Sequence, residues 1–246
     1  MTTGKTPAFY ALEGTTAWRE YVNLLHIPYT LWHLSYVVLG ATIAPTFHLD
    51  RMIWTLLAFF LAVGIASHSL DELKDRPLST RIPQGVLIGM AAVSLAGAMG
   101  LGVLAGFSET LWILPFVAFG GFIVVFYNLG IWHDRFHSGF WFAFSWGAFP
   151  VLTSYWINTF RLDASVVLLA FGCFIFTLTQ RTLSTQVRTV RRKAVRVEGI
   201  MELADGSAVR LDAGTLISVP ERALFLLSGA IVTFAASLLA FRLLNQ

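Results

Sequence analysis

Several stretches of about twenty residues in this chain carry no Lys, Arg, Asp or Glu side chain. A helix needs about 20 apolar residues to cross the hydrocarbon core of a bilayer. Lipid offers no partner for backbone N–H and C=O groups, so such a segment must be helical. Only 13% of the 246 residues are charged, against about 25% in soluble domains. The sequence therefore predicts an all-α fold, a multi-pass bundle of transmembrane helices.

We predict about seven spans, with approximate bounds 27–45, 52–70, 85–106, 110–129, 139–158, 164–183 and 221–243. The long loop before the last span contains VRVEGIMELADGSAVRLDAG, in which apolar and polar residues alternate on both sides of Asp205-Gly206. Asp-Gly between alternating segments is a strong β-hairpin signal. We therefore expect a transmembrane bundle in 1–184, a cytoplasmic basic segment with a β-hairpin in 185–218, and the last transmembrane helix in 219–246.

Seven spans place the two termini on opposite sides of the membrane, and the basic residues divide unevenly between those sides. Three of the 17 Lys and Arg residues lie on the C-terminal side: Arg51, Arg161 and Arg242. The other 14 lie on the N-terminal side: Lys5, Arg19, Lys74, Arg76, Arg81, Arg135, Arg181, Arg188, Arg191, Arg192, Lys193, Arg196, Arg210 and Arg222. Because cytoplasmic loops carry the excess of Lys and Arg, we predict an integral protein of the cell membrane with a cytoplasmic N-terminus.

The most charged short stretch, SHSLDELKDRPLSTRIP, directly follows the second predicted span. Asp71 and Asp75 are four residues apart and share one face of a helix. Two carboxylates at the membrane edge suit Mg²⁺, which completes its shell with water and phosphate oxygens. Three basic residues follow that could hold phosphate charge: Lys74, Arg76 and Arg81. The alternative is an ordinary mixed-charge helix end.

This stretch resembles the first aspartate-rich motif of the UbiA family of intramembrane prenyltransferases. That motif reads roughly N-D-x-x-D-x-x-x-D, followed by R-x-x-R-P. Asp71 and Asp75 match it, whereas Ser67 and His68 replace the leading Asn-Asp. The basic-proline tail is matched by Arg76, Arg81 and Pro83. The motif also falls after the second span, where the family carries it.

A second part of the resemblance follows the fourth predicted span. Tyr127, in VVFYNLGIWHDRFHSGFW, is similar to the family's Tyr-x-x-x-Lys region, with His133 or Arg135 where a basic residue is expected. The resemblance covers most of residues 20–190. It implies that Asp71, Asp75, Tyr127 and His133 are catalytic, with Mg²⁺ held by the two aspartates.

The chain departs from the family in two ways. The family usually has nine spans. Its second aspartate motif should end span six, where this chain reads TLTQRTLSTQVRTVRRK and has no carboxylate. Gln180, Arg181, Ser184 and Arg188 stand there instead. Arg181 and Arg188, about two helical turns apart, could replace a second metal because an arginine fork binds diphosphate oxygens directly.

The resemblance implies transfer of an isoprenoid chain from a prenyl diphosphate to a lipophilic or aromatic acceptor, with one Mg²⁺ site. The runner-up is a non-catalytic member of the same fold, a lipid-binding or assembly subunit whose protein partner docks on residues 195–212. No span carries a charge at its centre, which argues against an ion-coupled transporter. We expect membrane lipid, and no nucleic acid, around the chain.

Two histidine pairs have helical spacing: His26 with His33, and His133 with His137. Such pairs could suggest haem ligation, but no haem motif accompanies them. We expect hydrogen-bonded histidines at the membrane interface.

Overall fold

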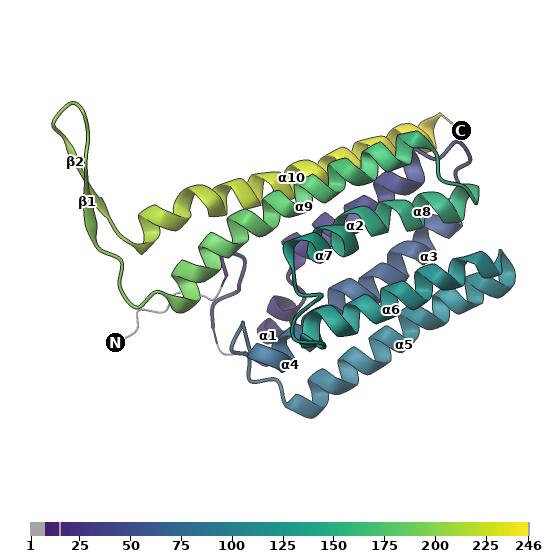
Figure 1. The fold of residues 1–246 in the computed structure, drawn as a ribbon, viewed down its shortest axis with the longest axis horizontal. Helices are drawn as coiled ribbons and strands as arrows, with labels where there is room; N and C mark the ends of the chain where they lie inside the picture. Colours follow the sequence, from purple (N-terminus) through teal and green to yellow (C-terminus); the bar gives the residue numbers. More distant parts are fainter. Residues whose placement is uncertain (1–7, 15, 246) are drawn as a thin grey trace.

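Long helices packed side by side dominate a computed structural model, which describes residues 8–14 and 16–245 (Figure 1). Lys5, counted above among the basic residues, lies outside the described residues. Helices α9 (Ala164–Arg188) and α10 (Ala213–Leu244) form one side of the molecule, and α5 (Gln84–Ser108) and α6 (Leu114–Leu129) form the other.

The helices between and beyond these two pairs are mostly shorter. Their bounds are α1 (Ala17–Leu24), α2 (Ile27–Thr42), α3 (Leu49–Phe59), η1 (Phe60–Ser67), α4 (His68–Asp75), η2 (Leu111–Ile113), α7 (Gly139–Ala143), η3 (Phe144–Ala148), α8 (Phe149–Thr159) and η4 (Thr189–Lys193). The η1 and η3 segments are π-helical turns inside longer helices. Helix α3 therefore continues through η1 into α4.

Within the described residues, five helices are long and apolar enough to span a membrane: Leu49–Asp75, Gln84–Ser108, Leu111–Leu129, Ala164–Lys193 and Ala213–Leu244. They make the chain an integral membrane protein of the multi-pass helical class. The first predicted span corresponds to α2, which has 16 residues and a length of about 24 Å at 1.5 Å per residue. The fifth corresponds to α7, η3 and α8. The count of seven spans, the cell membrane and the cytoplasmic N-terminus stay predictions.

The largest core cluster joins α2, α8, α9 and α10 around the buried rings of Trp32, Tyr36 and Tyr155. Helices α2 and α8 approach closely at Gly40, where a Cβ would lie 2.4 Å from the backbone oxygen of Val151. Small residues at such crossings let helix backbones approach within van der Waals contact, which is the main attraction between helices in lipid.

The predicted hairpin is confirmed. Strands β1 (Gly199–Glu202) and β2 (Ala208–Leu211) pair antiparallel with Met201 opposite Val209. Asp205 accepts hydrogen bonds from the backbone and side chain of Ser207, which lower the pKa of its carboxyl. Figure 1 places the hairpin beyond the ends of α9 and α10. Its cytoplasmic location stays a prediction.

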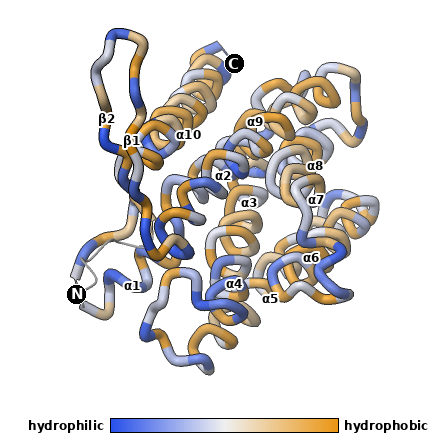
Figure 2. Tube along the Cα trace, turned by 60° about the vertical axis from the view of Figure 1, so that its left-hand side comes forward, coloured by the Kyte–Doolittle hydropathy of each residue, from blue (hydrophilic) through white to orange (hydrophobic). Residues whose placement is uncertain are grey.

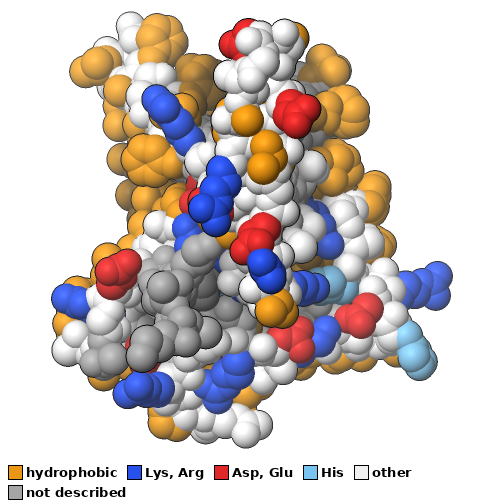
Figure 3. Space-filling model, turned by 90° about the vertical axis from the view of Figure 1, so that its left-hand side faces the viewer, with side chains coloured by type: hydrophobic (Ala, Val, Ile, Leu, Met, Phe, Trp, Pro, Cys, Tyr) orange, Lys and Arg blue, Asp and Glu red, His pale blue; other side chains and the backbone are white. Residues whose placement is uncertain are grey.

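Polar residues concentrate at the end of the bundle from which the hairpin projects. Figure 2 shows hydrophobic helices with hydrophilic segments around α1, α4 and the hairpin. Figure 3, which looks at this end, shows Lys, Arg, Asp and Glu side chains across it and apolar side chains on its flanks. We call it the charged end.

Candidate ligand pocket at the charged end

A polar pocket of about 120 Å³ lies at the charged end, between α2, α4, α6 and α9. Four residues singled out in the sequence line it: Asp71 on α4, Tyr127 on α6, and Arg181 and Arg188 on α9. Asp71 and Arg181, 110 residues apart in the chain, therefore contribute to one site.

Arginines of α9 and of the following η4 turn provide the positive charge around Asp71. Arg181, Arg188 and Arg192 are seven and four residues apart, so they lie on one helix face, and all three line the pocket. Arg188, Arg192 and His137 lie close enough to Asp71 to attract its charge. A single carboxylate among several guanidinium groups leaves the pocket with an excess of positive charge, which suits a phosphorylated ligand.

Tyr127 is fixed in the pocket wall by two neighbours. Arg181 donates a hydrogen bond to its hydroxyl at 2.5 Å. The ring of His137 stacks on the tyrosine ring at 4.4 Å between centroids. Arg181 also lies over the ring of Phe142, 5.3 Å from its centroid. The guanidinium is therefore held in place while it still lines the pocket.

The other acidic motif residue, Asp75, does not line the pocket. It is exposed one turn beyond Asp71, although it lies near enough to repel the charge of Asp71. Lys74 pairs with Asp134 at 2.9 Å, and this contact lowers the pKa of the Asp134 carboxyl. Lys74 thus connects α4 to the loop after α6.

Arg76, Arg81 and His133 also lie outside the pocket-lining set. Arg76 turns back on its own loop and donates to the carbonyl oxygens of Thr80 at 3.2 Å and Ile82 at 2.7 Å. Arg81 and His133 are exposed. His137, four residues after His133, lines the pocket instead.

Across residues 8–14 and 16–245, no group of three or more His, Cys, Asp or Glu side chains is arranged to hold a metal ion. Mg²⁺ commonly binds through one or two carboxylates and takes its other ligands from water and substrate phosphates. Asp71, with Asp75 one turn farther out, fits that small donor set. The arrangement suits a metal ion that arrives with a phosphate ligand.

Glu72, the third carboxylate of the motif, anchors a loop. It is 1% exposed, and its two side-chain oxygens accept hydrogen bonds from the backbone N–H groups of Leu78 and Thr80 and from the Thr80 hydroxyl, at 2.8–2.9 Å. These bonds tie the loop after α4 to the helix that carries Asp71.

Four histidines also line the pocket: His26, His33, His68 and His137. Sequence reasoning assigned none of them to the site. In three of them, Nδ1 lies at hydrogen-bond distance from a backbone carbonyl: 2.8 Å for His33, 3.1 Å for His68 and 3.0 Å for His137. Because a carbonyl can only accept, these Nδ1 atoms carry the proton and, in a neutral ring, Nε2 is an acceptor. The available signals were the position of His68 inside the motif and the helical spacing of His26 with His33 and of His133 with His137.

The pocket changes in character with depth. Arg188 is exposed and Asp71 is half-buried, whereas His33, Asn128 and Gln180 are 4%, 4% and 2% exposed. The Gln180 side-chain oxygen has no hydrogen-bond partner among the described residues. Charged groups thus surround the mouth, and neutral hydrogen-bonding groups form the floor.

Residues 8–10 cover part of this pocket. The Tyr10 ring packs 5.3 Å from the ring of His26 and 5.5 Å from that of Tyr29, and Phe9 packs on Tyr29. The Asn23 side chain bonds both the N–H and the C=O of Leu12. The segment is therefore attached to α1 and lies against the start of α2.

An apolar cavity of about 440 Å³ adjoins the polar pocket between α3, η1, α5, α6 and α8. Aromatic rings make up much of its wall: Trp54, Phe59, Phe116, Trp146 and Phe149. Trp146 lines both spaces. A polar pocket and an apolar cavity thus lie on the two sides of one buried tryptophan.

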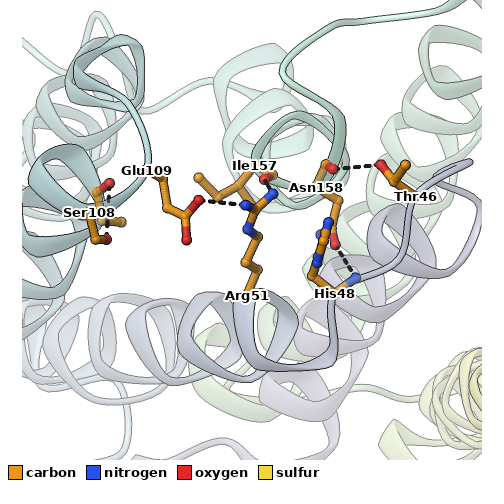
Figure 4. A network of polar contacts seen from close by, with 8 residues as sticks. Thr46, His48, Arg51, Ser108, Glu109, Ile157 and Asn158 are labelled. Carbon is orange, nitrogen blue, oxygen red and sulfur yellow. Dashed lines mark hydrogen bonds and ion pairs between the residues drawn. The ribbon is translucent and has the colours of Figure 1, made fainter.

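A polar network lies at the far end of the apolar cavity (Figure 4). Arg51 donates to the carbonyl oxygen of Ile157 at 3.1 Å and pairs with Glu109 at 2.5 Å. The Asn158 side chain accepts from the backbone N–H of His48, and its carbonyl accepts from the Thr46 hydroxyl. These contacts join the starts of α3 and the ends of α5 and α8.

Comparison with known proteins found no matching family model, no curated protein and no solved structure. The fold and the pocket alone define the class, an integral membrane helical bundle with a basic pocket next to an apolar cavity.

Proposed function

We propose that this chain is a UbiA-like prenyltransferase, which moves an isoprenoid chain from a prenyl diphosphate to a lipophilic or aromatic acceptor. The observation that carries the proposal is the pairing of a basic pocket, lined by Asp71, Arg181 and Arg188, with an apolar cavity that shares Trp146 with it as a wall residue. A prenyl diphosphate has the same polarity, with a highly charged head and a hydrocarbon chain.

In this proposal the diphosphate lies at the pocket mouth against Arg181, Arg188 and Arg192. Asp71, with Asp75 one turn away, would hold one Mg²⁺, which neutralises phosphate charge when bound. Arginine forks at fixed positions stabilise the negative charge that develops on the leaving group. Tyr127, bonded to Arg181, keeps that guanidinium oriented.

The reaction breaks the C–O bond between the prenyl chain and diphosphate, and the bonding electron pair leaves with the diphosphate. The acceptor forms a bond to the allylic cation and loses a proton. The Nε2 atoms of His33 and His137 are acceptors in the pocket wall that could take this proton. Trp146 and Phe142 flank the same region and can stabilise a cation through their ring faces.

The proposal is tested by pyrophosphate release from farnesyl diphosphate by the purified full-length chain in nanodiscs with MgCl2. We expect Asp71→Asn to reduce release at least 100-fold, since the variant loses the carboxylate in the pocket. Asp205→Asn, on the exposed hairpin, is the matched control and should retain the wild-type rate. Wild-type protein that releases no pyrophosphate, or an Asp71→Asn variant with full activity, would refute the proposal.

A second candidate is a non-catalytic lipid-binding or assembly subunit. The observation that favours it is the exposure of apolar hairpin side chains, 72% for Ile200 and 43% for Met201, within residues 195–212. A chain that binds farnesyl diphosphate with micromolar affinity but releases no pyrophosphate would support this candidate over the enzyme.

A further inference from the structure

The wall of the apolar cavity contains one hydroxyl group for which a hydrocarbon ligand offers no hydrogen-bond partner. Ser145 lines the cavity and is 4% exposed, and its hydroxyl has no hydrogen-bond partner among the described residues. The other hydroxyls in the wall each donate to a carbonyl of their own helix: Thr55 to Arg51, Ser108 to Ala105 and Thr153 to Phe149.

The local backbone at Ser145 differs from that at Thr55, Ser108 and Thr153, which lie in α-helices. Ser145 lies in the π-helical turn η3, where the backbone departs from the α-helical pattern in which a serine hydroxyl bonds the carbonyl four residues earlier. Single π-helical turns inside α-helices are frequent at functional sites. A second such turn, η1, contributes Ala62 and Val63 to the same cavity.

The charges at the far end of the cavity constrain the occupant. Asp50 and Glu109 contribute two carboxylates there, and Arg51 contributes one guanidinium that is already paired with Glu109. The excess negative charge disfavours an anionic head group at this end. The cavity volume of about 440 Å³ is within the range of about 300–1,000 Å³ that is usual for small-molecule sites.

We infer that the apolar cavity binds an uncharged lipophile that carries a hydrogen-bonding oxygen, with that oxygen bonded to the Ser145 hydroxyl. Aromatic rings of Trp54, Phe116 and Phe149 surround the rest of the molecule. The inference goes beyond the proposed function, in which the same cavity takes the prenyl chain, so the two occupants would compete for it.

The test compares two probes that differ in one oxygen, 4-nonylphenol and nonylbenzene, by equilibrium binding to the full-length chain in nanodiscs without diphosphate or Mg²⁺. We expect Ser145→Ala to weaken 4-nonylphenol binding about tenfold, as for the loss of one buried hydrogen bond. The same variant should leave nonylbenzene binding unchanged. The affinities of the variants are compared for one probe at a time, so the partition of that probe into the lipid of the nanodisc cancels.

Two further variants make the result specific. Ser154 is also buried and its hydroxyl also lacks a partner among the described residues, but it is not one of the cavity-lining residues; Ser154→Ala should leave both affinities unchanged. Gly120→Leu should weaken the binding of both probes, since a Cβ there has ordinary contact with Phe149 and the rest of the side chain extends into the cavity.

Wild-type protein that binds neither probe, or a Ser145→Ala variant that binds 4-nonylphenol within twofold of wild type, would overturn the inference. Pyrophosphate release is measured separately, so loss of the enzymatic proposal leaves this result interpretable.

Discussion

Replacing Glu72 tests whether the charged motif is partly a structural element. The side chain is 1% exposed and accepts three hydrogen bonds from Leu78 and Thr80, at 2.9, 2.8 and 2.9 Å. Within the described residues, no other side chain of the motif makes as many hydrogen bonds to the loop that joins α4 to α5.

The magnitude follows from these contacts. A hydrogen bond to a charged group contributes about 1.5–3 kcal/mol, and a buried donor left without a partner costs about 1–3 kcal/mol. The three bonds share one carboxylate and are not additive, so we expect Glu72→Ala to lower the free energy of unfolding by about 3–5 kcal/mol. Glu72→Gln keeps one acceptor oxygen and should cost about 2 kcal/mol.

The assay is reversible unfolding in mixed micelles as the SDS fraction rises. Glu20→Ala is the matched control, because Glu20 accepts one exposed hydrogen bond from the backbone of Arg81 in the same loop, and its loss should cost about 0.5–1 kcal/mol. If Glu72→Ala cost no more than Glu20→Ala, the loop would not depend on the carboxylate and the structural account would be wrong.

Three other perturbations use the same unfolding assay. Arg191→Met should lower the free energy of unfolding by about 2–3 kcal/mol. Its ion-pair partner, Glu221, is 16% exposed, so the variant leaves a mostly buried carboxylate without its partner arginine. Adding Glu221→Leu should recover most of the lost stability. Arg51→Met should cost about 1–2 kcal/mol through its bonds to two other helices. Burial, and then the neighbouring His68, hold the pKa of His26 well below its ordinary value of 6.5. The unfolded chain therefore binds more protons below that pH, and stability should fall as pH drops from 7 to 5. His26→Gln should reduce this fall, and an unchanged pH profile would contradict it.

The helical class and the hairpin could be predicted because both depend on local pattern. Uncharged stretches of span length require helices in lipid, and Asp205-Gly206 between alternating segments supplies the turn. The common face of Arg181 and Arg188 also follows from helical spacing alone. These inferences need no knowledge of which helices become neighbours.

The hydrogen-bond and ion-pair partners of the basic motif residues could not be predicted, because they depend on groups that the fold brings close. Lys74 is directed to Asp134, which is 60 residues away in the chain. Arg76 has a left-handed backbone with φ 48°, and its side chain turns back to the loop carbonyls. Spacing within the motif could not distinguish such contacts from phosphate binding.

The histidines were missed for a related reason. His33 bonds the carbonyl oxygen of Trp146, 113 residues away, so its orientation is set by a contact between α2 and η3. The π-helical turns were also invisible to helical periodicity, since one extra residue per turn changes which side chains face inward. Ser145 gains its position in the cavity wall from such a turn.

The apolar cavity and the polar pocket follow one another along the helix Leu49–Asp75, and this order favours one orientation of an amphiphilic ligand. Residues 50–63 of this helix line the apolar cavity, and residues 67–71 line the polar pocket. Helix α9 and the following η4 turn repeat the polar half of this order, from Gln180 at the neutral floor to Arg192 at the charged mouth. Under the proposed function, an anionic head lies at the charged end beside Arg181 and Arg188, and its chain points toward Trp146 and the apolar cavity. A head group placed at Arg51 would instead meet Asp50 and Glu109, so the reverse orientation is electrostatically disfavoured.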